Sequence, residues 1–200
     1  MKKAKKSQIE KIAYEHTRLL RILSSKKFQR KIGIAVSIMF AAIKDNKKII
    51  VCGNGGSAAD SQHLAGELVG RFQKERKALP CIALTTNTSI ITAIGNDYSF
   101  EKVFSRQIEA IGNNGDVLIL FSTSGRSKNI LDAALTAKKK NIKAISLTGS
   151  EPNELANISD INIAVPSKST PRIQELHSIV IHIICGLLEE KIFPDAIRKD

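Results

Sequence analysis

The sequence predicts an α/β fold, a three-layer sandwich in which helices cover both faces of a five-stranded parallel sheet. Five short runs rich in Ile, Val and Leu alternate with helical patterns, which is typical of βαβ units. The runs are almost continuously apolar, as strands buried on both faces are. A last helix is expected from about residue 172 to residue 190, with Pro171 in its first turn. The expected strands are 48–52, 81–84, 117–121, 144–147 and 161–165.

Two amphipathic helices are expected before the first strand, over residues 8–23 and 28–44. They make up an N-terminal segment, residues 1–45, which precedes a single α/β domain over residues 46–200. Because no strand comes before these helices, they have no sheet face of their own to cover. We expect them to pack on the α/β body or on a neighbouring subunit.

Positive charge is concentrated at the N-terminus. The chain has a formal net charge of +12, and residues 1–48 hold fourteen Lys or Arg against three acidic residues. A basic arm can bind nucleic acid or an anionic surface. However, this stretch has few aromatic residues and no recognisable DNA-binding motif. We interpret it as a solvated helical face and expect no nucleic-acid partner.

Composition and targeting signals predict a cytoplasmic protein. The 200 residues are 42% hydrophobic and 25% charged, and no apolar run approaches the roughly 20 residues that a membrane span needs. No signal peptide is recognisable. Cys52, Cys81 and Cys185 lie in apolar segments without metal-site spacing. We therefore expect them to be reduced and buried.

Two polar loops follow predicted strands, at the strand ends where doubly wound sheets bind ligands. Residues 53–57 read Gly-Asn-Gly-Gly-Ser, and residues 122–127 read Ser-Thr-Ser-Gly-Arg-Ser. Glycines let the backbone approach an anion, helix N-termini supply free N–H groups, and hydroxyls add donors. The second loop matches neither the P-loop nor the dinucleotide pattern. It predicts a phosphate site without implying a nucleotide, and purely structural glycine turns and serine caps are the alternative.

Four further polar residues have metal-site chemistry. His63 and Glu67 are four positions apart, so one helix face presents both to a single metal. Gln174 and His182 are eight positions apart on the last helix and project within about 80° of each other at about 3.6 residues per turn. Taken alone, each pair has a simpler interpretation: a surface His–Glu pair that stabilises its helix, or a histidine packed in a core or interface.

Six segments occur in an order and spacing typical of one family. They are GNGGSAADSQHLAGEL (53–68), IGNDYSF (94–100), FSRQIEAIG (104–112), GDVLILFSTSGRSKNI (115–130), LTG (147–149) and RIQELHSIVIH (172–182). On these segments the chain resembles the sugar isomerase (SIS) family, and within it the phosphoheptose isomerase branch. The resemblance covers nearly the whole chain after residue 45. It implies a flavodoxin-like, doubly wound sheet and a homotetramer with active sites at subunit interfaces.

The resemblance also implies residue roles. Residues of that branch hold a zinc ion at the positions that match His63, Glu67, Gln174 and His182. The hydroxyls implied to bind phosphate are Ser122, Thr123, Ser124 and Ser127. The residues implied to line the sugar are Asn54, Gly55, Gly56, Ser57, Glu67, Asn96, Asp97 and Gln174, with Arg71 placed only loosely. The general base matches Glu67 and the general acid matches His182.

These roles suit aldose–ketose isomerisation, which moves a proton between C1 and C2 through an enediol. The reaction needs a base beside the carbon, an acid for the oxygens and stabilisation of the enediolate charge. A carboxylate and an imidazole meet the first two needs, and a zinc ion can polarise the carbonyl. One tension is present, because zinc would lower the basicity of Glu67 if Glu67 were ligand and base at once. Glu67 either shifts between the two roles or leaves proton abstraction to another group.

The resemblance favours conversion of D-sedoheptulose 7-phosphate to D-glycero-D-manno-heptose 7-phosphate, which would supply heptose for a surface glycan such as lipopolysaccharide. Two alternatives are weighed against it. Some SIS proteins bind the replication initiator protein or sense sugar phosphates in regulators. Glu67 and His182, which are replaced in the initiator-binding relatives, are both present here, and no DNA-binding domain is recognisable. An isomerase of another sugar phosphate is the second alternative, because fold alone does not settle function.

Overall fold

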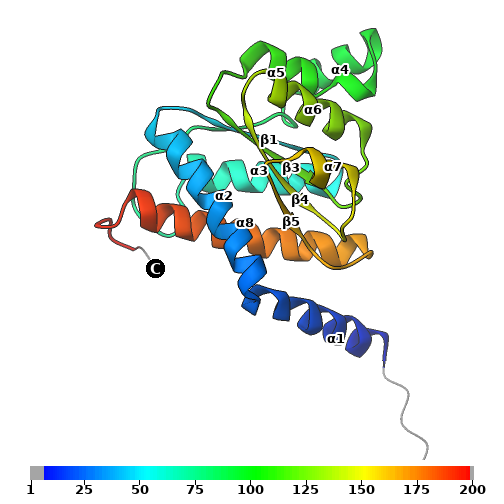
Figure 1. The fold of residues 1–200 in the computed structure, drawn as a ribbon, viewed down its shortest axis with the longest axis vertical. Coiled ribbons are helices and arrows are strands. Elements are labelled where there is room, and N and C mark those ends of the chain that lie inside the picture. Colours follow the sequence, from blue (N-terminus) through cyan, green and yellow to red (C-terminus); the bar gives the residue numbers. More distant parts are fainter. Residues whose placement is uncertain (1–6, 199–200) are drawn as a thin grey trace, which may run out of the picture.

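A five-stranded, all-parallel sheet forms the centre of the molecule, as the sequence predicts (Figure 1). The computed structural model describes residues 7–198. The strands lie in the order β2-β1-β3-β4-β5, the flavodoxin-like order, so the direction of winding reverses beside β1. Their bounds are β1 Ile49–Gly53, β2 Cys81–Ala83, β3 Val117–Ser122, β4 Lys143–Thr148 and β5 Ile161–Ala164.

Three helices cover one face of the sheet: α2 (Lys26–Lys44), α3 (Gly56–Val69) and α8 (Thr170–Ile192). Figure 1 shows them as the blue, cyan and orange-to-red helices on one side of the strands. Successive strand side chains point to opposite faces. Ile49 and Val51 of β1 therefore pack into this layer, where they join the apolar faces of the three helices in one buried cluster.

The opposite face carries a second apolar core. Ile50 and Leu118, which alternate with the residues of the first core, pack here against the helices. α4 extends from this layer and has no buried residue. The helices on this side are α4 (Thr88–Asp97), α5 (Ser105–Ile111), α6 (Lys128–Lys139) and α7 (Glu154–Ile158), with a short 3-10 turn, η2 (Phe100–Lys102). The three-layer prediction is therefore confirmed.

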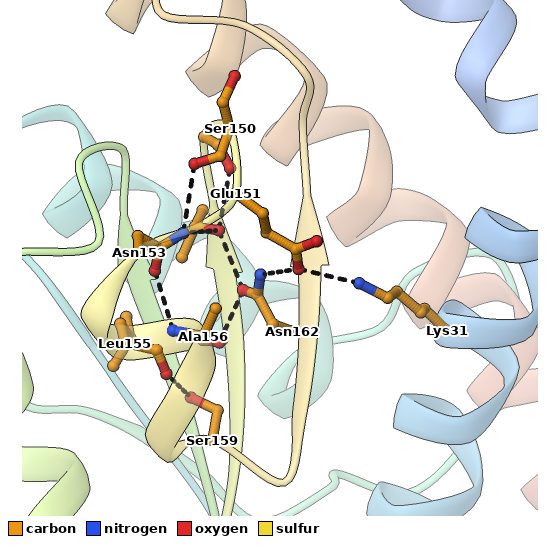
Figure 2. Close-up of polar contacts among 11 residues, drawn as sticks. Lys31, Ser150, Glu151, Asn153, Leu155, Ala156, Ser159 and Asn162 are labelled. Carbon is orange, nitrogen blue, oxygen red and sulfur yellow. Dashed lines mark hydrogen bonds and ion pairs between the residues drawn. The ribbon is translucent and has the colours of Figure 1, made fainter.

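The N-terminal segment meets the body chiefly through α2. That helix contacts α8 and β5, and Lys31 donates to Glu151 at 3.0 Å in a polar network around the loop after β4 (Figure 2). α1 (Gln8–Leu20) and the turn η1 (Arg21–Ser24) precede it. α1 extends away from the sheet (Figure 1), and its exposed side chains include apolar ones.

The carboxyl ends of β1 and β3 position the two polar loops. β1 and β3 are neighbours, and Gly53 is in register with Phe121. The glycine-rich loop and the serine-rich loop therefore leave the sheet side by side, at the edge where parallel sheets bind ligands.

Two further expectations concern membranes and cysteines. None of the helices described over residues 7–198 combines the length and apolar character needed to cross a membrane. Cys52, Cys81 and Cys185 are buried and unpaired, as predicted. Burial raises the pKa of the Cys81 thiol to about 12, which keeps it protonated and unreactive.

Candidate active site

Three side chains from two distant parts of the chain meet at one point of the surface. On α3, Nε2 of His63 lies 3.2 Å from Oε1 of Glu67. On α8, Nε2 of His182 lies 3.1 Å from Nε2 of His63. One ligand atom from each of the three residues lies within 4.8 Å of the other two. His63 and Glu67 are half-buried and His182 is exposed, so the group is open to a ligand from solvent.

The group exists because α3 and α8 lie side by side. Gly56, at the start of α3, faces Gln174, near the start of α8, and His63 faces His182 further along. A Cβ atom on residue 56 would overlap the Gln174 amide, so glycine lets that side chain lie directly against the start of α3. Within residues 7–198, Gln174 forms no side-chain hydrogen bond to the other three predicted ligands. Its role as a fourth ligand therefore stays a prediction.

The serine-rich loop forms a tight turn between β3 and α6. The N–H of Gly125 donates to Oγ of Ser122 at 3.1 Å, and the N–H of Arg126 donates to Oγ of Ser124 at 3.2 Å. Ser127 is the N-cap of α6, but its hydroxyl makes no capping hydrogen bond and lies 3.5 Å from Oγ of Ser122. Hydroxyls and the positive end of a helix therefore converge here, which suits an anion.

The glycine-rich loop is joined to the serine-rich loop by a pair of amides. The side chains of Asn54 and Asn129 exchange two hydrogen bonds of 2.9 Å each. Asn129 lies in the first turn of α6, directly after the serine-rich loop. Gly55 adopts a φ of +56°, a conformation that favours glycine, and Ser57 is buried at the start of α3.

The remaining predicted site residues form no side-chain hydrogen bond to His63, Glu67 or His182 in the part of the chain that the structure describes. Asn96 and Asp97 are exposed at the end of α4, where the Asn96 amide donates to Asp97 at 2.8 Å. Arg71 is exposed in the loop after α3. Thr123 accepts a hydrogen bond through its carbonyl from Gly149, at 3.1 Å. In the described chain no hydrogen bond joins Asn96, Asp97 or Arg71 to the two loops or to His63, so their roles stay predictions.

Asp60 is a buried acid beside the site that motif reasoning missed. It lies on α3 one turn before His63, and Ser178 of α8 donates to its Oδ1 at 3.3 Å. Its Oδ2 has no partner among the described residues. Burial raises the pKa of Asp60 to about 6, against the opposing effects of the Ser178 hydrogen bond and of nearby His63. An acid three residues before His63 on an otherwise buried helix face was the available signal.

Comparison with known proteins identifies the family. A family model for the SIS domain matches residues 14–149. The phosphoheptose isomerase of Sulfurimonas denitrificans is 48% identical over 99% of this chain and 100% of its own length. The chain belongs to the phosphoheptose isomerase family. A second member, from Geotalea daltonii, is 54% identical over 82% of this chain and 85% of its own length.

Solved structures of the phosphoheptose isomerase family agree with this fold. The protein from Francisella tularensis superposes with a TM-score of 0.85 at 35% identity, covering 92% of this chain and 100% of its own. The phosphoheptose isomerase from Neisseria gonorrhoeae gives a TM-score of 0.82 at 37% identity over the same shares. The resemblance noted from the sequence motifs is confirmed.

The donor atoms of His63, Glu67 and His182 fit a zinc ion. Zinc prefers imidazole nitrogen and carboxylate oxygen at about 2.0–2.2 Å in a tetrahedron, which separates the ligand atoms by roughly 3.4 Å. The distances of 3.1 Å and 3.2 Å among His63, Glu67 and His182 are close to that separation. The residues present could therefore hold the metal with little movement.

Proposed function

We propose that this chain interconverts D-sedoheptulose 7-phosphate and D-glycero-D-manno-heptose 7-phosphate through an enediol, using Glu67 as base and His182 as acid. One observation carries the assignment: in a member of the phosphoheptose isomerase family, a carboxylate and two imidazoles from separate helices meet within 4.8 Å. The positions of Glu67 and His182 are replaced in the initiator-binding relatives, so this group favours an enzyme over a binding protein. The product would supply heptose for a surface glycan.

The proposed chemistry divides between the two groups. Glu67 takes the proton from C1 of the ketose and returns it to C2. His182 donates a proton to the oxygen on C2 and receives the one that leaves the oxygen on C1, so protons balance across the enediol. The two side chains both contact His63, which places them close enough to act on adjacent carbons of one substrate.

A zinc ion is the proposed cofactor. His63, Glu67 and His182 would hold it, with the Gln174 amide as the proposed fourth ligand. A bound zinc ion supplies positive charge that polarises a carbonyl oxygen. Because a metal ligand is a weaker base, and an imidazole nitrogen bound to a metal carries no proton, Glu67 would act as base and His182 as acid through atoms that are not bound to the ion at that step. The half-exposed positions of His63 and Glu67 leave the carboxylate room for that movement.

The serine-rich loop is the proposed phosphate subsite. Ser122, Thr123, Ser124 and Ser127 would donate hydrogen bonds, and the start of α6 would add its positive end. Asn96, Asp97 and the glycine-rich loop, residues 53–57, would line the sugar. Hydrogen bonds to a charged phosphate are stronger than those to a neutral sugar, so this subsite would exclude unphosphorylated heptoses.

A homotetramer in the cytoplasm is the proposed form of the enzyme. Apolar side chains remain exposed on the N-terminal helices, with Ile9 at 79%, Ile12 at 40% and Ile34 at 38% of full exposure. Such surface favours burial between copies of the chain. Three buried, unpaired thiols suit a reducing compartment. A single-chain mass by light scattering at micromolar concentration would contradict the tetramer.

The deciding experiment is incubation of the purified protein with sedoheptulose 7-phosphate while the aldose product is followed. Unphosphorylated sedoheptulose and other ketose phosphates serve as controls. Turnover of the heptulose phosphate alone is the expected result. Faster turnover of a hexulose or pentulose phosphate would favour another sugar-phosphate isomerase, and inertness towards all of them would favour a binding protein.

A further inference from the structure

A buried arginine caps the end of the helix that carries Glu67. The side chain of Arg76 is completely buried. Its Nη2 donates to the carbonyl of Glu67 at 2.7 Å, and its Nη1 donates to the carbonyls of Leu68 at 2.8 Å and Gly70 at 3.0 Å. The last carbonyls of a helix have no partner within the helix. Arg76 supplies these partners from one rigid, planar group.

The same arginine binds the helix that carries His182. Its Nε donates at 2.9 Å to Oε1 of Glu189, a residue of α8 whose side chain is 2% exposed. Glu189 also accepts three backbone N–H groups, from Phe72 at 2.9 Å, Gln73 at 2.9 Å and Lys74 at 3.0 Å. Burial alone would raise the pKa of Glu189, but these N–H groups and Arg76 hold it below its ordinary value.

These contacts meet the site from both sides. Arg76 donates a hydrogen bond to the backbone carbonyl of Glu67, the proposed base. Glu189 lies two turns after His182 on α8. It fixes the backbone of Phe72, whose ring packs against the His182 imidazole at a centroid distance of 5.4 Å. The Arg76–Glu189 ion pair therefore bonds to the backbone at Glu67 and to the backbone of the residue that packs against His182.

We infer that Arg76 and Glu189 are positioning residues of the isomerase site, which hold the end of α3 against α8 and so set the separation of Glu67 and His182. This inference rests on the proposed roles of those two groups. A buried ion pair is often no more stabilising than a well-packed apolar pair, so stability alone does not account for it. Its geometric effect does, because a misplacement of about 1 Å at reacting groups can cost about 100-fold in rate.

A neighbouring ion pair provides a matched control. Lys74 belongs to the same loop, its side chain is 4% exposed, and it binds Glu190 of α8 at 2.9 Å and the carbonyl of Phe193 at 2.8 Å. It contributes to packing between the loop and α8 but touches no carbonyl of α3. Exchanging lysine and arginine at each position keeps the charge and changes the size of the donor group and the number and geometry of its N–H donors.

The test compares Arg76→Lys with Lys74→Arg in the full-length protein. For each variant, kcat and KM for sedoheptulose 7-phosphate are measured. Zinc affinity is measured by competition with a chromogenic chelator, and far-ultraviolet circular dichroism reports whether the fold is kept. Arg76→Lys should keep the fold but lose about 10- to 100-fold in both kcat and zinc affinity, the range typical of groups that orient metal ligands. Its KM should change less than about threefold, because the serine-rich loop lies elsewhere. Lys74→Arg should match the wild type within about twofold.

Several results would overturn the inference. If Arg76→Lys keeps both kcat and zinc affinity within about twofold of wild type, or if the two variants lose equally, Arg76 does not position the site. If Arg76→Lys fails to fold, the double variant Arg76→Gln/Glu189→Gln removes both buried charges and keeps amide hydrogen bonds. A double variant that folds and turns over at the wild-type rate also overturns the inference.

The measurements distinguish failure of the proposed function from failure of the positioning role. A wild-type protein that is inert towards sedoheptulose 7-phosphate refutes the proposed function, and this inference with it. A wild type that is active but binds no zinc refutes the metal assignment, while kcat still decides the role of Arg76. An active wild type with an unaffected Arg76→Lys variant refutes the positioning role alone.

Discussion

The side chains of Asn54 and Asn129 form a closed pair in which each amide donates to the other at 2.9 Å. Asn54 belongs to the glycine-rich loop after β1, and Asn129 belongs to the first turn of α6, 75 positions later. The pair therefore fixes the distance between the proposed sugar and phosphate subsites. Asn54 was predicted to face the sugar, and the structure shows that its side chain also serves this link.

Asn129→Ala should weaken substrate binding with little effect on the rate of the chemical step. The change removes two hydrogen bonds and leaves the Asn54 amide unpaired, at a cost of about 1–3 kcal/mol. We expect KM for sedoheptulose 7-phosphate to rise about tenfold and kcat to fall less than about threefold. Asn157→Ala, at an exposed position of α7, is the control. Unchanged KM in Asn129→Ala would show that the loops keep their separation without the pair.

Glu67→Gln tests the proposed base. The substitution keeps the size of the side chain, so the fold and its circular dichroism spectrum should persist. Turnover should fall at least about 100-fold, because general acid–base catalysis contributes about 10²–10⁴ in rate. The measurement is a steady-state assay on enzyme loaded with equal zinc. Turnover within a few-fold of wild type would remove Glu67 from the proton-transfer step.

Zinc content should depend on the three residues that meet at the surface. We expect about one zinc per chain after purification without chelator, because two imidazoles, a carboxylate and an amide oxygen make a four-ligand site. Chelation should abolish or sharply lower activity. The far-ultraviolet circular dichroism should stay unchanged, because His63, Glu67 and His182 belong to neither of the two apolar cores that hold the helices on the sheet. Elemental analysis measures the metal directly.

Substitutions separate metal ligands from other histidines. His63→Ala and His182→Ala should each lose zinc. His16→Ala is the matched control, because His16 bonds to Glu175 at 2.9 Å and belongs to α1. A wild-type protein that neither contains zinc nor binds it would refute the metal assignment, as would full zinc occupancy in both His63→Ala and His182→Ala.

Ser124→Ala and Ser127→Ala test the phosphate subsite. A hydrogen bond to a charged group contributes about 1 kcal/mol or more, so each variant should bind the sugar phosphate about fivefold less tightly. Affinity is measured by calorimetry with the sugar phosphate, and Ser89→Ala, exposed on α4, is the control. Equal wild-type affinity for phosphorylated and unphosphorylated sugar would refute the subsite.

His177 predicts a loss of stability in mild acid. It is buried, and burial lowers its pKa from 6.5 to about 4 despite a hydrogen bond to the Thr148 carbonyl. Between those values the unfolded chain binds a proton at this residue that the folded chain does not, so the contribution of His177 to the free energy of unfolding falls as the pH drops from 6.5 towards 4. At about 1.36 kcal/mol per pKa unit the loss approaches about 3 kcal/mol.

Denaturant titrations at several pH values measure this effect. His177→Gln has no proton to gain and should show a flatter profile than wild type between pH 6.5 and 4.5, whatever its stability at pH 7. Carboxylates with lowered pKa values, such as Asp116, contribute mainly below that window. Asp60, whose pKa burial raises to about 6, acts within the window and stabilises the fold as the pH falls, so the difference between the two profiles is what reports His177. Parallel profiles for wild type and His177→Gln would mean that His177 is protonated in the fold.

The sheet and its neighbouring helices could be predicted because their signals are local. β3, for example, is a run of six buried residues, Val117–Ser122, and the apolar character of its first five shows in the sequence alone. Pro171 likewise marks the first turn of α8. The four proposed metal ligands could be named from the family resemblance, and the structure brings His63, Glu67 and His182 together. That contact depends on how α3 and α8 pack against each other, and the residue spacing within either helix does not predict that packing.

The supporting contacts could not be predicted, for a physical reason. The pairs Asn54–Asn129 and Arg76–Glu189 join residues 75 and 113 positions apart. The sequence motifs contain Asn54 and Asn129 but do not indicate that their side chains bond to each other, and nothing in the flanking sequence distinguishes Arg76 or Glu189 from a solvated surface residue. Only the packed structure, where Glu189 is 1% exposed, shows that these groups must be paired.

The way α8 divides its surface has an evolutionary consequence. Ile181 and Ile184 of α8 are buried in the core, whereas His182 between them is exposed. Loss of α8 would remove part of the core and unfold the protein. Substitution of the exposed His182 would change the free energy of unfolding only slightly. With His182 in its proposed role as acid, a point substitution at this position would remove catalysis while the scaffold survives. Duplicated copies are free to become sensors or adaptors that retain the architecture of an enzyme.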